Sequence, residues 1–365
     1  MKLRDALLWP PTALYEACTR ARNAAYDRNM LTPNRLNGVL ISVGNLTVGG
    51  TGKTPMVLWI AQRLLGEGKK VGILTRGYRG NSQPAPASDG SVAPSTASSG
   101  GSSSVGTSSS DEVRMLSSRL GGQVAFGVGP NRFARGRELA ARGIDWFVLD
   151  DGFQHRQLAR DVDIVLIDST NPFGGGHLLP LGRLREPRSG ISRADIIVIT
   201  RSEHSPAIEA AVQHDSRAPI FYARPYLESV HSINGGAAAS EYPSNDLSKD
   251  PATRAQKLFA FCGIGNPSAF LADLRDWGFQ VAGHKFYRDH HRYSPRDLDE
   301  IQAEARKAGA LSLICTEKDI FNLPRDLFNV SSQPTLPILY CRISMRIDRE
   351  DEFWRAVLAK SALKT

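Results

Sequence analysis

The sequence has few cysteines and no long hydrophobic run. Its four cysteines lie far apart and form no C-x-x-C pair; they are Cys18, Cys262, Cys315 and Cys341. This spacing argues against a structural zinc site and a disulfide framework, and it is typical of a reducing compartment. No stretch of about 18 apolar residues occurs, so we expect no transmembrane helix. The apolar run at residues 6–9, interrupted by Pro10 and Pro11, is too short for a secretory signal, and we expect a cytoplasmic protein.

Acidic side chains are the scarcer charged type. Lys and Arg number 45 and Asp and Glu number 37, which gives a formal net charge of +8. This balance favours an anionic partner, such as a nucleotide, a nucleic acid or an acidic membrane surface, without choosing among them. The basic residues are scattered and no zinc-finger or helix-turn-helix signature is present, so we do not expect nucleic-acid binding.

Residues 1–30 form a partly apolar, arginine-containing segment. A helix is expected at 12–28, with one side formed by Leu14, Tyr15, Cys18, Ala21 and Ala25. Positive charge comes from Arg20, Arg22 and Arg28. Two interpretations remain open: a helix packed on its own domain, or an interfacial helix on an anionic membrane surface.

From residue 38 onward, short apolar runs alternate with helical segments. The expected strands are 39–43, 71–74, 124–126, 146–149, 162–167 and 196–199. Continuous apolar runs are typical of strands buried on both faces. Helices are expected near 53–66, 111–120 and 131–142. This series predicts an α/β fold with a mostly parallel sheet flanked by helices.

Two stretches lack the residues needed for a core. Residues 81–110 are rich in Ser, Gly, Ala and Pro, contain Asp89 as their only charge and have no aromatic residue. Such a composition predicts a disordered insertion, and 233–254 is a shorter stretch of the same kind. A smaller α/β unit follows, with strands at 258–262, 311–315 and 338–341, a helix after 263–267 and a final helix at 350–361. We therefore expect three parts: an N-terminal helix at 1–30, a core at 31–232 and a smaller domain at 255–365.

A glycine-rich turn follows the first buried strand and leads into a Lys-Thr pair. Its predicted phosphate-binding residues are Thr47, Val48, Gly49, Gly50, Thr51, Gly52, Lys53 and Thr54. In a P-loop, backbone N–H groups and the helix N-terminus surround the phosphates, Lys reaches the β and γ oxygens, and Thr binds Mg²⁺. The usual first glycine of this motif is Thr47 here. The strand before the turn and the helix after it favour a P-loop NTPase-like core that binds ATP and Mg²⁺.

A second buried strand ends in two carboxylates, Asp150 and Asp151. Adjacent carboxylates repel one another unless a cation is near. In P-loop enzymes such a strand lies beside the phosphate loop and contributes to the Mg²⁺ site. Gln154 and His155 follow at once and are close enough in sequence to reach the same cleft.

Further short motifs follow in a fixed order. They are Thr75-Arg-Gly-Tyr78, Asp111-Glu112, Asp150-Asp-Gly-Phe-Gln-His155, Leu179-Pro-Leu-Gly-Arg-Leu-Arg-Glu-Pro187, Phe261-Cys-Gly-Ile-Gly-Asn-Pro267, Asp289-His-His291 and Thr316-Glu-Lys-Asp319. With the phosphate loop, this set resembles the tetraacyldisaccharide 4'-kinases, the lipid A 4'-kinases of Gram-negative bacteria, over about residues 2–360.

The resemblance implies roles for individual residues. Asp111 would be the catalytic base, paired with a histidine of the smaller domain, His290 or else His291. Arg185 and Lys53 would complete the catalytic set, Glu186 would join Thr54, Asp150 and Asp151 at Mg²⁺, and Asn45, Gln154 and His155 would lie near the acceptor. Without the resemblance, Asp111-Glu112 would be interpreted as an ordinary helix start. Arg185-Glu186 would be interpreted as a surface ion pair.

The resemblance also implies the reaction and its setting. The expected activity is phosphorylation by ATP of the 4'-hydroxyl of tetraacyldisaccharide 1-phosphate, the lipid A disaccharide precursor. We then expect a monomer, peripheral on the cytoplasmic face of the bacterial inner membrane. The alternative is a P-loop GTPase or ATPase of the switch or partitioning type. Against it, Val48 stands where that class often has a lysine, and no Asn-Lys-x-Asp base reader occurs.

Overall fold

The computed structural model describes residues 3–77, 110–233, 246–324 and 335–362. The insertion predicted at 81–110 lies outside these ranges except for Ser110, which caps a helix. Residues 234–245 of the second predicted insertion also lie outside. The prediction for 246–254 was wrong, because η2 (Leu247–Lys249) and α6 (Pro251–Ala255) form there. Asp246 and Asp250 cap these two helices with side-chain hydrogen bonds, a local signal for helix starts.

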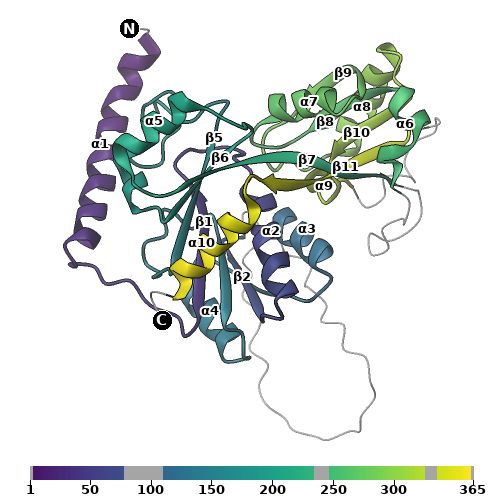
Figure 1. Ribbon diagram of the computed structural model, residues 1–365. Helices are drawn as coiled ribbons and strands as arrows, with labels where there is room; N and C mark the ends of the chain where they lie inside the picture. Colours follow the sequence, from purple (N-terminus) through teal and green to yellow (C-terminus); the bar gives the residue numbers. More distant parts are fainter. Residues whose placement is uncertain (1–2, 78–109, 234–245, 325–334, 363–365) are drawn as a thin grey trace, which may run out of the picture.

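One eleven-stranded sheet runs through the described chain in the order β3-β2-β4-β1-β5-β6-β7-β11-β10-β8-β9. The first block comprises β3 (Ala125–Val128), β2 (Val71–Thr75), β4 (Trp146–Asp150), β1 (Val39–Asn45), β5 (Val162–Asp168), β6 (Ile196–Thr200) and β7 (Ile220–Ile233). The second comprises β11 (Ile338–Ile347), β10 (Ser312–Thr316), β8 (Lys257–Cys262) and β9 (Gln280–Phe286). Neighbouring strands are parallel within each block, and the blocks meet at the antiparallel pair β7–β11 (Figure 1).

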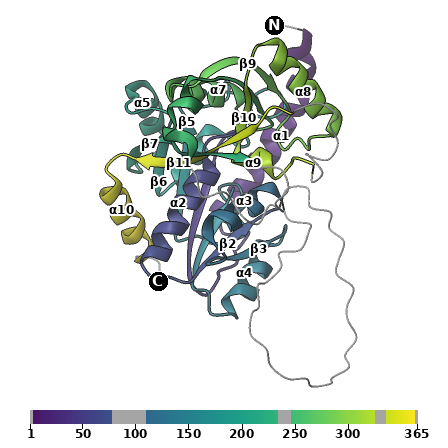
Figure 2. The same cartoon turned by 90° about the vertical axis from the view of Figure 1, so that its right-hand side faces the viewer.

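Helices cover the sheet. They are α1 (Leu3–Asp27), α2 (Lys53–Gly66), α3 (Asp111–Leu120), α4 (Arg132–Ala140), η1 (Arg188–Arg193), α5 (Pro206–Asp215), α7 (Pro267–Asp276), α8 (Pro295–Lys307), α9 (Glu317–Ile320) and α10 (Glu350–Ala362). Helices α2 and α3 lie side by side near β2 (Figure 2). The mostly parallel α/β fold is thus confirmed, and all six strands expected between residues 38 and 200 are present.

The last helix returns to the first half of the sheet. Phe353, Trp354 and Val357 of α10 are buried in the same apolar cluster as Met56 of α2 and Ile41 of β1. The Trp59 ring of α2 packs edge-on against Phe353 at 5.5 Å. One sheet therefore connects the two expected α/β units, and the chain ends against the first of them. The domain boundaries at 232 and 255 stay a prediction.

Helix α1 begins earlier than expected and runs through Pro10 and Pro11. Proline removes a backbone donor from a helix. Here the Thr12 hydroxyl donates to the carbonyl of Leu8 at 2.8 Å, and contacts with the core hold the helix. The Tyr15 hydroxyl donates to the Arg185 carbonyl at 2.7 Å, for example. Tertiary contacts thus override the proline signal.

The side of α1 that faces the core is polar. Thr12, Thr19 and Asn23 are buried there. Leu14, Cys18 and Ala21, on the expected apolar side, are exposed instead. The helix therefore packs on its own domain and still carries an outward apolar stripe, so both open interpretations retain a structural basis.

Candidate active site

The phosphate loop connects the C-terminal end of β1 to the N-terminal end of α2. Gly49 and Gly52 have φ angles of 132° and 88°, which favour glycine. The Asn45 side-chain amide donates to the carbonyl of Thr47 at 2.7 Å, and the Thr200 hydroxyl donates to that of Thr51 at 3.2 Å. No side chain caps the first turn of α2 at Gly52. The backbone N–H groups at this helix start are thus directed toward the place of an anion.

The C-terminal half of the chain touches this loop. A Cβ added to Gly265 would lie 2.5 Å from the backbone nitrogen of Gly50. Asn266 follows and donates to Asp168 of β5 at 3.1 Å. The turn between β8 and α7 therefore presses on the phosphate loop, and only glycine fits at this contact.

The Lys53 side chain points toward Asp151, which directly follows β4. Its Nζ lies 3.2 Å from Asn45 Oδ1 and 3.5 Å from Asp151 Oδ1. Arg185 binds the two oxygens of Asp151 at 2.8 and 2.7 Å. Burial would raise the pKa of Asp151, but Lys53 and Arg185 bring it below its ordinary value. Asp151 is thereby an ionised anchor for two cations that also line the cavity.

Asp150 has a different environment. Strand β4 pairs with β1 so that Asp150 is opposite Val43, which confirms the expected neighbourhood of the two strands. The Asp150 carboxyl is buried and accepts a hydrogen bond from the Thr75 hydroxyl at 3.4 Å. Burial, together with the charges of Glu112 and Asp151, raises its pKa to about 7. A nearby cation would relieve this cost.

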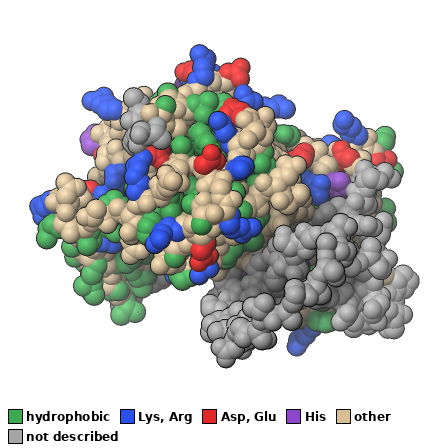
Figure 3. Space-filling model, turned by 90° about the horizontal axis from the view of Figure 1, so that it is seen from below, with side chains coloured by type: hydrophobic (Ala, Val, Ile, Leu, Met, Phe, Trp, Pro, Cys, Tyr) green, Lys and Arg blue, Asp and Glu red, His purple; other side chains and the backbone are tan. Residues whose placement is uncertain are grey.

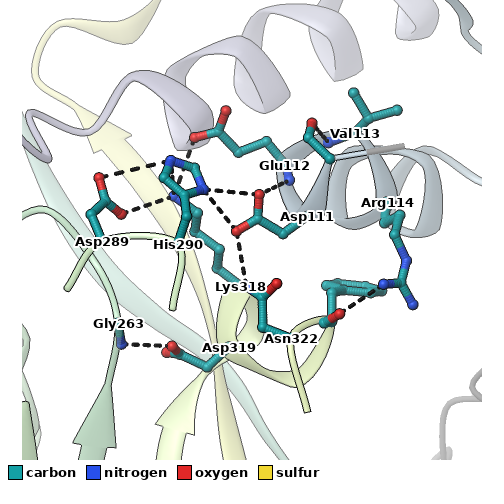
Figure 4. Close-up of polar contacts among 12 residues, drawn as sticks. Asp111, Glu112, Val113, Arg114, Gly263, Asp289, His290, Lys318, Asp319 and Asn322 are labelled. Carbon is teal, nitrogen blue, oxygen red and sulfur yellow. Dashed lines mark hydrogen bonds and ion pairs between the residues drawn. The ribbon is translucent and has the colours of Figure 1, made fainter. Parts of the chain in front are cut away.

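Asp111 and His290 meet across the two halves of the sheet (Figure 4). Nδ1 of His290 lies 3.0 Å from each carboxylate oxygen of Asp111, and Asn322 donates to Asp111 at 3.0 Å. Burial opposes ionisation of Asp111, but the hydrogen bond from His290 and the charge of Lys318 lower its pKa to about 2. The hydrogen bond to Asp111 raises the pKa of His290. The neighbouring His291 contacts Asp297 instead, at 3.2 Å.

Two cavities meet at this site. The first, of about 400 Å³, is lined by the phosphate loop and by residues of both halves, including Asp150, Asp151, His290 and Lys318. The second, of about 530 Å³, lies between α1 and the core. Both are lined by Val48, Arg76, Asp151 and Arg185. A ligand in the second cavity can therefore approach a phosphate held in the first.

Gln154 and His155 line the second cavity. Gln154 also donates to the backbone carbonyl of Asn45 at 2.8 Å. Burial and nearby arginines, Arg132 first among them, lower the pKa of His155 to about 4. The ring is thus neutral at physiological pH and is able to both donate and accept hydrogen bonds.

Glu186 is fully buried. Its carboxylate accepts hydrogen bonds from Asn23 at 3.2 Å, Gln154 at 2.9 Å and Arg193 at 2.7 Å. Glu186 therefore ties α1 and the residues of the second cavity together, and a magnesium role for it stays a prediction.

Two contributors to the site were not singled out in the sequence. Lys318 belongs to the Thr316–Asp319 motif. The motif contributed to the family resemblance, but none of its residues was given a role. Asn322 bonds to Asp111 at 3.0 Å but stands in no recognisable motif. Its contact depends on the fold of the segment after α9.

The donor set suits a magnesium ion that also binds phosphate. Thr54 and Asp150 line the same cavity and offer hydroxyl and carboxylate oxygens. Mg²⁺ prefers such hard oxygen ligands and is commonly held by one or two protein groups with phosphates and water. Among residues 3–77, 110–233, 246–324 and 335–362, no group of three or more His, Cys, Asp or Glu could hold a metal. The set of Thr54 and Asp150 is the size expected of protein groups that share a metal with phosphate oxygens.

Comparisons with known proteins show which family the chain resembles. The tetraacyldisaccharide-1-P 4'-kinase family matches residues 4–362. A tetraacyldisaccharide 4'-kinase of Halothermothrix orenii is 38% identical over 325 residues, covering 86% of this chain and 81% of that protein. One from Chlorobium limicola is 34% identical over 360 residues, covering 97% of each.

A solved structure is similar over nearly the whole chain. The "apo" form of LpxK from Aquifex aeolicus, in complex with ATP, has a TM-score of 0.67 and 26% identity, covering 98% of this chain and 99% of that one. The family predicted from the sequence motifs is confirmed by these matches. This chain belongs to the tetraacyldisaccharide 4'-kinase family.

Proposed function

We propose that this protein transfers the γ-phosphate of ATP to the 4'-hydroxyl of a tetraacyldisaccharide 1-phosphate. The observation that carries the proposal is the Asp111–His290 pair, whose histidine lines the same cavity as the phosphate loop. The family match over residues 4–362 favours a kinase over a P-loop switch or partitioning protein.

Each group has a task that its position supports. The N–H groups of residues 49–54 and Lys53 hold the β and γ phosphates, where their charges offset the developing negative charge. Mg²⁺, held by Thr54 and Asp150, would neutralise phosphate charge. Asp111 accepts the proton of the sugar hydroxyl, and His290 stabilises the protonated state of the pair through Nδ1. Arg185 is fixed by Asp151 at the junction of the two cavities.

The second cavity suits an anionic sugar acceptor. Its wall includes Arg22, Arg76, Arg132 and the neutral His155. Guanidinium groups bind phosphate well, and a neutral imidazole and an amide bind sugar hydroxyls. We infer that the disaccharide lies here, with its 4'-hydroxyl toward Asp111 and its 1-phosphate among the arginines.

The proposal is tested by an assay with purified protein, Mg-ATP and a disaccharide 1-phosphate acceptor. The expected product carries a new phosphomonoester at the 4' position, which ³¹P NMR distinguishes from the 1-phosphate. Omission of Mg²⁺ should abolish the reaction. Hydrolysis of ATP without any phosphorylated acceptor would contradict the proposal.

The setting of the enzyme is inferred from its surface. None of the helices in the described ranges has the length and apolar character needed to span a bilayer. Seen from below, Lys and Arg side chains are dispersed over the described part of that face (Figure 3). On α1, Leu7, Trp9 and Leu14 are 78%, 58% and 68% exposed. We infer that these exposed side chains enter the membrane interface on the cytoplasmic side, where we place the acceptor.

Replacing Leu7, Trp9 and Leu14 together with Gln should release the protein from lipid. Less apolar area then enters the interface, so vesicle binding in a flotation assay should fall by about tenfold or more. Activity on acceptor dispersed in detergent should stay near wild type, because each of these side chains is more than half exposed. Leu311→Gln is the matched control, since Leu311 is 62% exposed in the other half of the chain. Equal flotation of the triple variant and wild type would refute the interfacial role.

A further inference from the structure

Lys318 lies beside the Asp111–His290 pair, on the wall of the first cavity (Figure 4). Its Nζ is 3.3 Å from Glu112 Oε1, 3.3 Å from Asp289 Oδ1 and 3.4 Å from Nε2 of His290. Its side chain is only 17% exposed. A lysine this deep, with three polar partners, is a fixed part of the site rather than a solvated surface charge.

Helix α9, which carries Lys318, is held by hydrogen bonds to the residues that flank Lys318 in the chain. Asp319 accepts hydrogen bonds from the backbone and the hydroxyl of Thr316, at 3.2 and 2.5 Å. Glu317 accepts from Arg119 of α3 and from Arg342 of β11, each at 3.0 Å. Both flanking carboxylates are buried. This scaffold directs the ammonium of Lys318 toward His290 and limits its freedom to turn away.

The contact with Nε2 decides which nitrogen of His290 carries the proton. An ammonium has three donors and no acceptor, so Nε2 must accept from it. The proton of the neutral ring is then on Nδ1, where it donates to Asp111. Without Lys318, the Asp289 carboxylate, 3.8 Å from Nε2, would compete for the ring proton. That tautomer would turn an unprotonated Nδ1 toward the Asp111 carboxylate, and the pair would be broken.

We propose that Lys318 is a positioning residue for the phosphoryl transfer: it fixes the His290 tautomer whose Nδ1–H faces Asp111. This inference rests on the proposed roles of Asp111 and His290. Charged groups at this imidazole include Asp111 from α3, Asp289 from its own turn and Lys318 from α9, and Glu112 of α3 contacts the Lys318 ammonium. Lys318 is the cation among these four, and it offsets the carboxylates on the Nε2 side.

The charge of Lys318 also opposes protonation of the ring, although the hydrogen bond to Asp111 raises the pKa of His290 overall. The form of the pair that accepts a proton has a neutral imidazole. Activity should therefore fall on the acid side as His290 becomes protonated. Removing Lys318 raises the pKa of His290 further, so the acid limb of the pH–rate profile moves to higher pH.

The test compares wild type with Lys318→Met, Lys318→Arg and the control Lys285→Met. Lys285 also contacts two carboxylates, Glu300 at 3.1 Å and Glu304 at 2.7 Å, but lies away from the cavities. Lys318→Met should lower kcat by about 10- to 100-fold, with KM for ATP within about threefold and the acid limb moved upward. Lys318→Arg should recover most of kcat, and Lys285→Met should match wild type.

A second readout is independent of activity. In protein with ¹⁵N-labelled histidine at about pH 9, where imidazole is neutral, NMR should show Nε2 of His290 as the unprotonated nitrogen. Lys318→Met should shift the proton toward Nε2. A protonated Nε2 in wild type would overturn the inference, and so would a fall in kcat with an unmoved pH profile. If wild type failed to phosphorylate the acceptor, the proposed function would fail, while the tautomer would still report on Lys318.

Discussion

Asp111→Asn should lower kcat by about 1,000-fold, the largest loss expected from a single change in this protein. An amide keeps the size of the carboxylate and still accepts from His290, but it does not take up a proton from the sugar hydroxyl. With a pKa of about 2, the native carboxylate is ionised over the whole neutral range. KM for ATP should change by less than about threefold, because Asp111 has no contact with the phosphate loop.

A matched control is available for this change. Asp297→Asn replaces a carboxylate that contacts Nε2 of His291 at 3.2 Å, so each variant changes an Asp–His contact on one of two neighbouring histidines. Initial rates at saturating Mg-ATP should be near wild type for Asp297→Asn. If Asp111→Asn kept more than a tenth of the wild-type kcat, or if the two variants were equally impaired, Asp111 would not be the base.

Lys53→Met should lower kcat/KM by about 100- to 1,000-fold. The methylene chain is largely preserved, but the charge that offsets the β and γ phosphates is gone. Lys53 also lowers the pKa of Asp150, so its removal favours the protonated form of the carboxyl that we place at Mg²⁺. Both effects weaken phosphate binding, and isothermal titration with an ATP analogue should show the loss directly.

The control for Lys53 is Lys69→Met, which removes a lysine stacked on Trp146, 5.4 Å from the ring centroid and outside the cavity. It should bind the analogue as wild type does. A Lys53→Met protein with less than a tenfold loss in kcat/KM would mean that the γ-phosphate lies away from this lysine.

The sequence predicted the first half of the sheet well because its strands are buried on both faces. Their apolar runs are uninterrupted, and β1 and β4 lead directly into the phosphate loop and the Asp150–Asp151 pair. Strand β9 gave no such signal, because it alternates exposed and half-buried residues at the sheet edge. Strand β7 contains Pro225 and several polar residues, although its first part pairs with β6 and its longer part with β11.

Residue patterns predicted only part of the candidate site. The phosphate loop is local in sequence, whereas Asp111 and His290 are 179 residues apart and meet only after the sheet has formed. Only the family resemblance placed them together. The sequence also did not predict which side of α1 packs on the core, because its buried side is made of Thr12, Thr19 and Asn23 rather than of apolar residues. Such polar contacts depend on partners elsewhere in the fold.

A crystal structure with Mg²⁺ and a non-hydrolysable ATP analogue tests the central assignment most directly. We expect the β and γ phosphates on the N–H groups of residues 49–54, the metal between them, Thr54 and Asp150, and the γ-phosphate facing the Asp111–His290 pair. Phosphates bound elsewhere, or a γ-phosphate shielded from Asp111 by the body of the protein, would contradict the assignment.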